Sequence, residues 1–225
     1  MTVELPECIE INPACAPRAS ILWLHGLGAD GNDFAPLIPQ LGIVDTLGVR
    51  VVLPHAPHQP VGINNGMVMR AWYDITATDF RVTEDAAGIR ASEALLGALM
   101  EREMERGIPA EHILLAGFSQ GGAIALHTGL RYPQRLAGIL VLSAYLPLAA
   151  SLAAERAAAN AGIPILQAHG THDPLVPLVW AMQSRDYLEE LGYRIDWREY
   201  PMQHAMCPQE VEDIRNWIVN VLGTV

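Results

Sequence analysis

The sequence predicts a doubly wound α/β fold with a mostly parallel central sheet and helices on both faces. Apolar runs alternate with helical patterns along the chain, which is typical of parallel strands joined by right-handed crossover helices. All but the last of the apolar runs are nearly continuous, as expected where both faces of a parallel sheet are covered. No linker, repeat or charge block divides the 225 residues, so we expect one domain, 1–225.

The expected strands are short runs rich in branched aliphatic side chains. The last of them is more polar than the others, so we expect it near an edge of the sheet. In chain order these strands are Ser20–His25, Val49–Leu53, Ile113–Gly117, Gly138–Leu142, Ile163–Ala168 and Ile195–Tyr200.

Helices are expected between the strands. The longest, Thr83–Arg106, opens with Thr-Glu-Asp, which resembles an N-cap followed by acidic residues in the first turn. It is expected to end at Gly107, because Pro109 stops it from continuing. The other expected helices are 32–41, 120–131, 177–191 and 208–222.

Residues 54–80 do not fit this alternation. The segment holds several prolines and glycines followed by large apolar side chains. A long connection in a compact domain is usually functional, and this one is too apolar to be simply disordered. We expect an excursion over the carboxyl ends of the strands, where ligands bind in such sheets. A loop packed for stability alone is the alternative.

The charge and composition exclude several functions. The formal net charge of −11 argues against nucleic acid and anionic membrane surfaces as partners. All 14 basic residues are arginine, so Schiff-base lysine chemistry, a Walker lysine and a Ser-Lys dyad are excluded.

The three cysteines, Cys8, Cys15 and Cys207, lack the spacing of a disulfide framework or a zinc site. The N-terminus has no signal-peptide pattern, and no apolar run is long enough for a membrane span. We therefore expect a cytoplasmic protein without stable membrane insertion.

The sequence Gly117-Phe118-Ser119-Gln120-Gly121 lies between an expected strand and an expected helix. A strand, a G-x-S-x-G turn and a helix in direct succession hold a serine on a sharp bend with its hydroxyl projecting from the sheet. Backbone N–H groups at the helix start point toward whatever that serine attacks. We therefore expect Ser119 to be the nucleophile of an acyl-transfer reaction; the alternative is a chance match in a glycine-rich loop.

A serine nucleophile needs a general base, usually a histidine that a carboxylate orients. Asp173 follows the expected strand Ile163–Ala168 in a turn rich in glycine and proline, at the carboxyl end of the sheet. We expect Asp173 to be the orienting acid. A cap of the helix that starts near residue 177 is the alternative role.

His204 is the best candidate for the base, because it follows the last expected strand and completes the chain order Ser, Asp, His. His172 directly adjoins Asp173, so the two would need an awkward local geometry to act together on Ser119. His169 stands at a strand end and is expected to bond the turn backbone.

An oxyanion hole needs two donors that point at the developing charge. One is expected to be the backbone N–H of Gln120, next to the nucleophile. The other is expected from the glycine-rich loop after the first strand, with Leu27 as the natural donor. His25 in this loop is expected to orient the backbone and not to catalyse.

Five segments together match one family in order and spacing. They are LHGLGADGNDF at 24–34, MRAWYDI at 69–75, LAGFSQGGAIAL at 115–126, HGTHDPLVP at 169–177 and YPMQH at 200–204. The chain resembles the carboxylesterase/acyl-protein thioesterase family of small α/β-hydrolases, also called the phospholipase/carboxylesterase family.

The resemblance implies an α/β-hydrolase fold and a triad of Ser119, Asp173 and His204. It implies Leu27 and Gln120 as backbone oxyanion donors, and hydrolysis of carboxylic esters or thioesters through an acyl-enzyme without a cofactor or metal. After His204 the chain reads Ala-Met-Cys-Pro where many members carry His-Ser-Val, which puts only the packing of the histidine loop in question.

Apolar side chains near these residues are expected to form an acyl groove, because methionine and aromatic side chains make adaptable apolar surfaces. Core packing is the alternative, above all for Met69 and Trp72. The expected groove residues are Ile63, Met67, Met69, Trp72 and Tyr73, together with Leu27, Leu175 and Val176.

The leading hypothesis is an esterase for short- to medium-chain acyl esters, acting on a small-molecule or lipid-like substrate. An acyl-protein thioesterase or a lysophospholipase would use the same triad, and the sequence does not separate them. A catalytically silent binding module is less favoured, because the chain keeps every triad residue and both glycines of the G-x-S-x-G turn. A homodimer remains an open alternative for its assembly.

Overall fold

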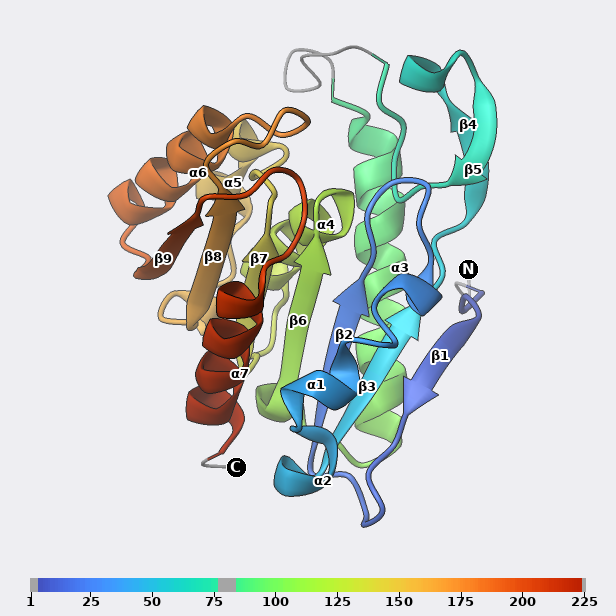
Figure 1. Ribbon diagram of the computed structural model, residues 1–225, viewed down its shortest axis with the longest axis vertical. Coiled ribbons are helices and arrows are strands. Elements are labelled where there is room, and N and C mark those ends of the chain that lie inside the picture. Colours follow the sequence, from blue (N-terminus) through green and yellow to red (C-terminus); the bar gives the residue numbers. More distant parts are fainter. Residues whose placement is uncertain (1–3, 77–83, 224–225) are drawn as a thin grey trace.

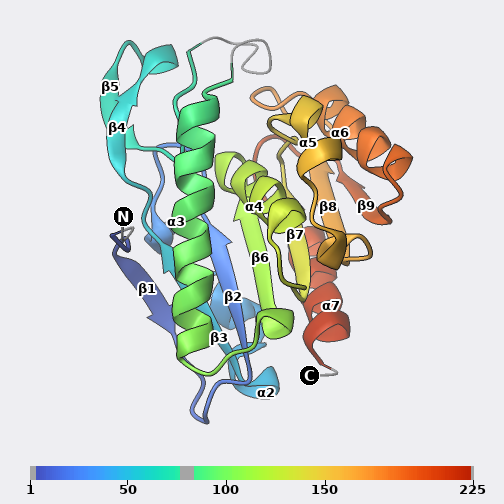
Figure 2. The same ribbon diagram turned by 180° about the vertical axis from the view of Figure 1, so that it is seen from behind.

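A computed structural model describes residues 4–76 and 84–223. Its centre is a seven-stranded sheet in the order β1-β3-β2-β6-β7-β8-β9, with helices on both faces (Figures 1 and 2). Only β1 runs antiparallel to its neighbour; the other pairs are parallel. This confirms the predicted α/β fold. The strands are β1 (Cys8–Ile11), β2 (Ala19–Leu24), β3 (Val49–Pro54), β6 (Ile113–Phe118), β7 (Gly138–Leu142), β8 (Ile165–Gly170) and β9 (Ile195–Tyr200).

The predicted strands all form, with ends shifted by no more than about two residues, the usual uncertainty at element boundaries. Every residue of β2, β3, β7 and β8 is buried, which explains why these sequences are mainly apolar. β9 lies at an edge and is largely half-buried or exposed, as its polar sequence predicted. The opposite edge strand, β1, was not predicted.

The two large apolar clusters of the core lie on opposite faces of the sheet. One face is covered by α3 (Ala86–Glu105), α4 (Gln120–Arg131), α5 (Ala149–Glu155) and α6 (Leu178–Glu190), as Figure 2 shows. The other carries α1 (Ile38–Leu41), α2 (Val44–Leu47) and α7 (Pro208–Leu222), which lie in front of the sheet in Figure 1.

Two helix predictions need correction. The single helix expected over 32–41 is a 3₁₀ turn, Gly31–Asp33, followed by the short α1, because Pro36 and Pro39 interrupt the helical hydrogen bonds. The start expected for the long helix, Thr83, lies outside the described residues. Asp85 caps α3, since its side chain accepts a hydrogen bond from the Gly88 N–H.

The described part of the segment 54–80 forms a two-stranded hairpin of β4 (His58–Val61) and β5 (Met67–Arg70), joined through a 3₁₀ turn, Gly62–Asn64. In Figure 1 the hairpin stands beyond the carboxyl end of β2. Residues 77–80 of the segment lie outside the described residues.

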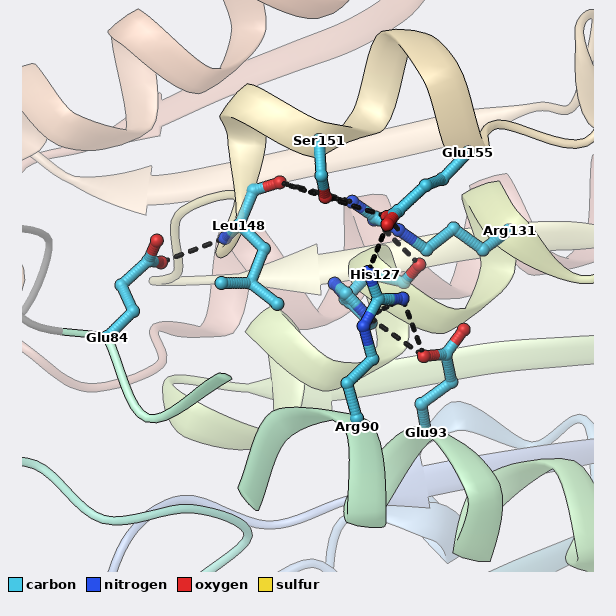
Figure 3. Close-up of polar contacts among 8 residues, drawn as sticks. All are labelled: Glu84, Arg90, Glu93, His127, Arg131, Leu148, Ser151 and Glu155. Atoms are coloured by element: carbon cyan, nitrogen blue, oxygen red, sulfur yellow. Dashed lines mark hydrogen bonds and ion pairs between the residues drawn. The ribbon is translucent and has the colours of Figure 1, made fainter. Parts of the chain in front are cut away.

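An ionic network joins three helices behind the sheet (Figure 3). Glu155 of α5 accepts hydrogen bonds from Arg90 of α3, at 2.5 Å, and from Arg131 of α4, at 2.7 Å. These bonds lower the pKa of Glu155 to about 2. Glu93 of α3 accepts from Arg90 at 3.0 Å and lies 3.2 Å from Nε2 of His127 on α4. The network therefore anchors α4, the helix that follows Ser119, at its far end.

Candidate active site

Ser119 lies on the sharp turn between β6 and α4, with φ 55° and ψ −122°. Few residues other than glycine adopt a positive φ, and such strain is typical of functional sites. Two backbone hydrogen bonds hold the turn. The Ser119 N–H donates to the Leu142 carbonyl at 2.8 Å, and the Ala123 N–H donates to the Ser119 carbonyl at 3.0 Å.

Only glycine fits two positions before and two positions after this serine. A Cβ on Gly117 would lie 2.3 Å from the carbonyl carbon of Gly121. A Cβ on Gly121 would lie 2.4 Å from the carbonyl oxygen of Leu24, because α4 begins directly against the end of β2. The two glycines of the motif thus allow the strand, the turn and the helix to meet backbone to backbone.

His204 and Asp173 are joined by a hydrogen bond of 2.6 Å between Nδ1 and Oδ2. The other carboxyl oxygen of Asp173 accepts from the N–H groups of Leu175 and Val176, both at 2.9 Å. Burial of Asp173 opposes its charged form, but the bonds from His204 and from the backbone outweigh it, so the pKa of Asp173 lies below its ordinary value. A charged Asp173 accepts the Nδ1–H of His204 and leaves Nε2 available toward the cavity.

Ser119 and His204 both line a cavity of about 500 Å³ at the carboxyl end of the sheet. The imidazole of His204 packs against Phe118, with ring centroids 4.7 Å apart. Within the described part of the chain the Ser119 hydroxyl makes no hydrogen bond. Catalytic hydrogen bonds often tighten only when a substrate is bound, so the shared cavity is the relevant observation.

The two expected oxyanion donors, Leu27 and Gln120, also belong to the wall of this cavity. Gln120 is the first residue of α4, where backbone N–H groups lack a partner within the helix. The loop that carries Leu27 is held by His25, whose Nε2 accepts from the Ala56 N–H at 3.0 Å and whose Nδ1 bonds the Gly26 carbonyl at 2.7 Å. Burial lowers the pKa of His25, so it orients this loop as a neutral ring.

The remaining histidines of the predicted site take different places. Nε2 of His169 donates to the Val176 carbonyl at 2.8 Å and lies 3.5 Å from Asp173, so it supports the turn that carries the acid. His172 is exposed; its Nδ1 lies 3.3 Å from the neighbouring Thr171 hydroxyl, and its backbone N–H donates to the Met202 carbonyl at 3.0 Å. The structure therefore brings His204, and not His172, to Asp173.

The predicted groove residues divide into two sets. The first set, which lines the cavity, is Leu27, Ile63, Tyr73, Leu175 and Val176. The structure places the other three elsewhere. Trp72 is buried in the core against α3, with 1% of its surface exposed. Met67 and Met69 belong to β5 of the hairpin, and neither is part of the cavity wall. Met67 is 64% exposed, and the Met69 sulfur accepts a hydrogen bond from Asn64.

Tyr145, which lies beside Tyr73 in the cavity wall, was not among the predicted site residues. The hydroxyls of Tyr73 and Tyr145 lie 3.2 Å apart, and both side chains are almost fully buried. Tyr145 follows β7 at the carboxyl end of the sheet, and this position was the only signal in the sequence that could have identified it. Phe34, Ile75 and Phe118 complete the apolar part of the wall.

The described residues contain no group of three or more His, Cys, Asp or Glu side chains that is placed to hold a metal ion. None of the helices formed within 4–76 and 84–223 is both long and apolar enough to cross a membrane.

Comparison with known proteins gives a consistent result. The model of the family described as Phospholipase/Carboxylesterase matches residues 7–222. Acyl-protein thioesterase 1 of Neurospora crassa is 40% identical over 95% of this chain and 91% of its own length. Acyl-protein thioesterase 1 of Cryptococcus neoformans is 34% identical over 95% of this chain and 97% of its own.

Solved structures agree with this comparison. The crystal structure of Arabidopsis thaliana SOBER1 is 32% identical, has a TM-score of 0.86, and covers 91% of this chain and 99% of its own. The crystal structure of Zea mays acyl-protein thioesterase 2 is 27% identical at a TM-score of 0.86, with 97% of this chain and 100% of its own covered.

Proposed function

Because the chain belongs to the phospholipase/carboxylesterase family, and is therefore a hydrolase of ester or thioester bonds, we propose that it acts through a covalent acyl-enzyme on Ser119. One observation carries this proposal: the hydrogen-bonded pair of His204 and Asp173 faces the cavity that Ser119 also lines. A nucleophile, a base and an acid that orients the base are the minimum set for this chemistry.

The reaction begins when Ser119 Oγ attacks the carbonyl carbon of the substrate and Nε2 of His204 accepts the hydroxyl proton. The carbonyl oxygen becomes an oxyanion, which the N–H groups of Leu27 and Gln120 stabilise. When this intermediate collapses, the alcohol or thiol leaves with the proton from His204, and the acyl group stays on Ser119. A water molecule, activated by His204, then releases the acid and restores the serine.

We assign the acyl chain to the apolar part of the cavity. Ile63, Ile75 and Val176 supply aliphatic surface there, and the volume of about 500 Å³ is within the usual range of small-molecule sites. This supports short- to medium-chain acyl esters as substrates.

A thioester on a protein cysteine is the second candidate, and the relatives named acyl-protein thioesterase 1 favour it. A lysophospholipase would use the same chemistry. The candidates are separated by kcat/KM for matched substrates: an oxygen ester and a thioester of one acyl group, and a lysophospholipid of the same chain. A thioester preference of more than about tenfold after correction for intrinsic reactivity would select the second candidate.

The nucleophile itself is tested with a fluorophosphonate probe. We expect the parent protein to be labelled at Ser119 and the Ser119→Ala variant to remain unlabelled. Labelling at another serine, or none at all in a folded parent protein, would contradict the proposed mechanism.

A further inference from the structure

The segment Arg70–Tyr73 lies beside the loop that carries Leu27 and is bonded to it on both sides of that residue. The Gly28 N–H donates to the Arg70 carbonyl at 2.8 Å. The indole Nε1–H of Trp72 donates to the His25 carbonyl, also at 2.8 Å. Leu27 therefore lies between two residues, His25 and Gly28, that are both hydrogen-bonded to this segment.

The same segment is bonded to the side chain of Gln120. Oε1 of Gln120 accepts the Trp72 backbone N–H at 2.8 Å, and its Nε2–H donates to the Tyr73 carbonyl at 2.8 Å. Gln120 is only 3% exposed, so water does not replace these bonds. The Gln120 side chain is thus hydrogen-bonded to the same segment that holds the loop of Leu27.

The segment is itself firmly held in the core. Trp72 is 1% exposed, and its carbonyl accepts a hydrogen bond from the Ser92 hydroxyl on α3. Its ring packs against that of His25, with centroids 5.2 Å apart. Movement of Trp72 would break several buried hydrogen bonds at once. The segment is therefore a fixed support for the loop that carries Leu27 and for the turn that carries Gln120.

We propose that Trp72 and the side chain of Gln120 are positioning residues that set the spacing between the N–H groups of Leu27 and Gln120. This inference rests on the proposed function of those two N–H groups as oxyanion donors. Such donors act because they are fixed in advance at hydrogen-bond distance from the developing charge. A displacement of about 1 Å can lower the rate about 10²-fold.

Trp72→Phe tests the inference, since it removes the indole N–H and keeps an aromatic ring in the core. Trp23→Phe is the matched control. Trp23 is also 1% exposed, but its Nε1 has no hydrogen-bond partner in the part of the chain that the structure describes. Both variants lose similar volume, and only the first loses a bond to the loop of Leu27.

The readouts are kcat, KM, the thermal unfolding midpoint and Ki for a trifluoromethyl ketone. Ser119 Oγ adds to the ketone carbon, its proton passes to His204, and the ketone oxygen becomes an oxyanion. We expect Trp72→Phe to lower kcat about 10- to 100-fold, with KM within about threefold, and to raise Ki by the same factor as it lowers kcat/KM. Trp23→Phe should lower the midpoint similarly and change kcat by less than about threefold.

Equal kcat losses in the two variants, or a Trp72→Phe variant with the parent kcat and Ki, would overturn the inference. If Trp72→Phe does not fold, Gln120→Met gives the same test, because it keeps the backbone N–H and removes both side-chain bonds. Gln120→Met with the parent Ki would then overturn it. Failure of the proposed function has a different signature: Ser119→Ala would keep the parent activity.

Discussion

At the scale of single residues, Asp173 defines how the site is arranged. One of its oxygens is occupied by two backbone N–H groups, so only the other faces His204. Asp173→Asn keeps the shape of the side chain but removes the charge, so His204 is expected to adopt the wrong tautomer. We predict a loss of about 10⁴ in kcat with an unchanged unfolding midpoint. An Asp173→Asn variant with nearly full activity would contradict this role.

Ser119 and His204 are expected to act as one unit. Ser119→Ala and His204→Ala should each lower kcat by about 10⁴–10⁶, and the double variant should lose little more than either single one. The matched control is His172→Ala, because His172 is exposed and lies beside Asp173 in the sequence. Additive losses of kcat in the double variant, or a comparable loss of kcat in His172→Ala, would contradict the assignment.

At the scale of an element, α7 carries a buried acid in its first turn. Glu210 is 0% exposed, and neither carboxyl oxygen has a hydrogen-bond partner within the described residues. Burial raises the pKa of Glu210 from 4.5 to about 8, although the nearby Cys207 backbone N–H favours the charged form. Between these pH values the folded protein holds a proton that the unfolded chain has released, so rising pH favours unfolding.

Glu210→Gln should therefore flatten the pH dependence of the free energy of unfolding between about pH 5 and 8. The parent is expected to lose up to about 1.4 kcal/mol per pH unit from this group in that window. Chemical denaturation across pH measures the effect, and Glu212→Gln, on an exposed position of the same helix, is the control. Parallel pH profiles for the parent and Glu210→Gln would contradict it.

The elements that the sequence predicted are those whose local pattern agrees with their tertiary environment. The central strands have nearly continuous apolar runs because both of their faces are buried. By contrast, β1 has only four residues, and β4 includes a proline and two polar residues, so neither has a strand pattern. The short α5 is held to α4 by the ion pair of Glu155 and Arg131, which a local reading cannot detect.

The candidate site follows the same rule. Ser119, Asp173 and His204 were identified because each follows a strand in a distinctive motif, and strand ends meet at one edge. Trp72 was expected in the groove because aromatic side chains make adaptable apolar surfaces, with core packing as the alternative. Its burial depends on α3, and its bond to the His25 carbonyl crosses 47 positions of sequence, so no local pattern could indicate either.

At the scale of the whole molecule, we propose that residues 1–225 form one domain. Both apolar clusters pack on the same sheet, so neither should unfold without exposing the other. Calorimetry should give a single transition with equal calorimetric and van't Hoff enthalpies. Two resolved transitions would contradict the single-domain proposal.

The cavity should determine chain-length preference. Each buried methylene contributes about 0.8 kcal/mol, so kcat/KM should rise about three- to fourfold per added methylene until the cavity is full. Ile63→Trp should shift the optimum to shorter chains, since Ile63 lines the cavity. Val68→Trp is the control on the same hairpin, because Val68 is 62% exposed and outside the wall. An identical profile in all three proteins would refute this role of the cavity.

The central claim is that the acyl group passes through Ser119, and rapid mixing with a p-nitrophenyl ester tests it most directly. We predict a burst of about one equivalent of p-nitrophenol, and acid quenching during the burst should trap the acyl group on the peptide that contains Ser119. The ester is chosen for slow deacylation, so that the acyl-enzyme accumulates, and the Ser119→Ala variant is measured alongside. An acyl group trapped on another residue, such as Cys207, or turnover by Ser119→Ala at the parent rate would contradict the account.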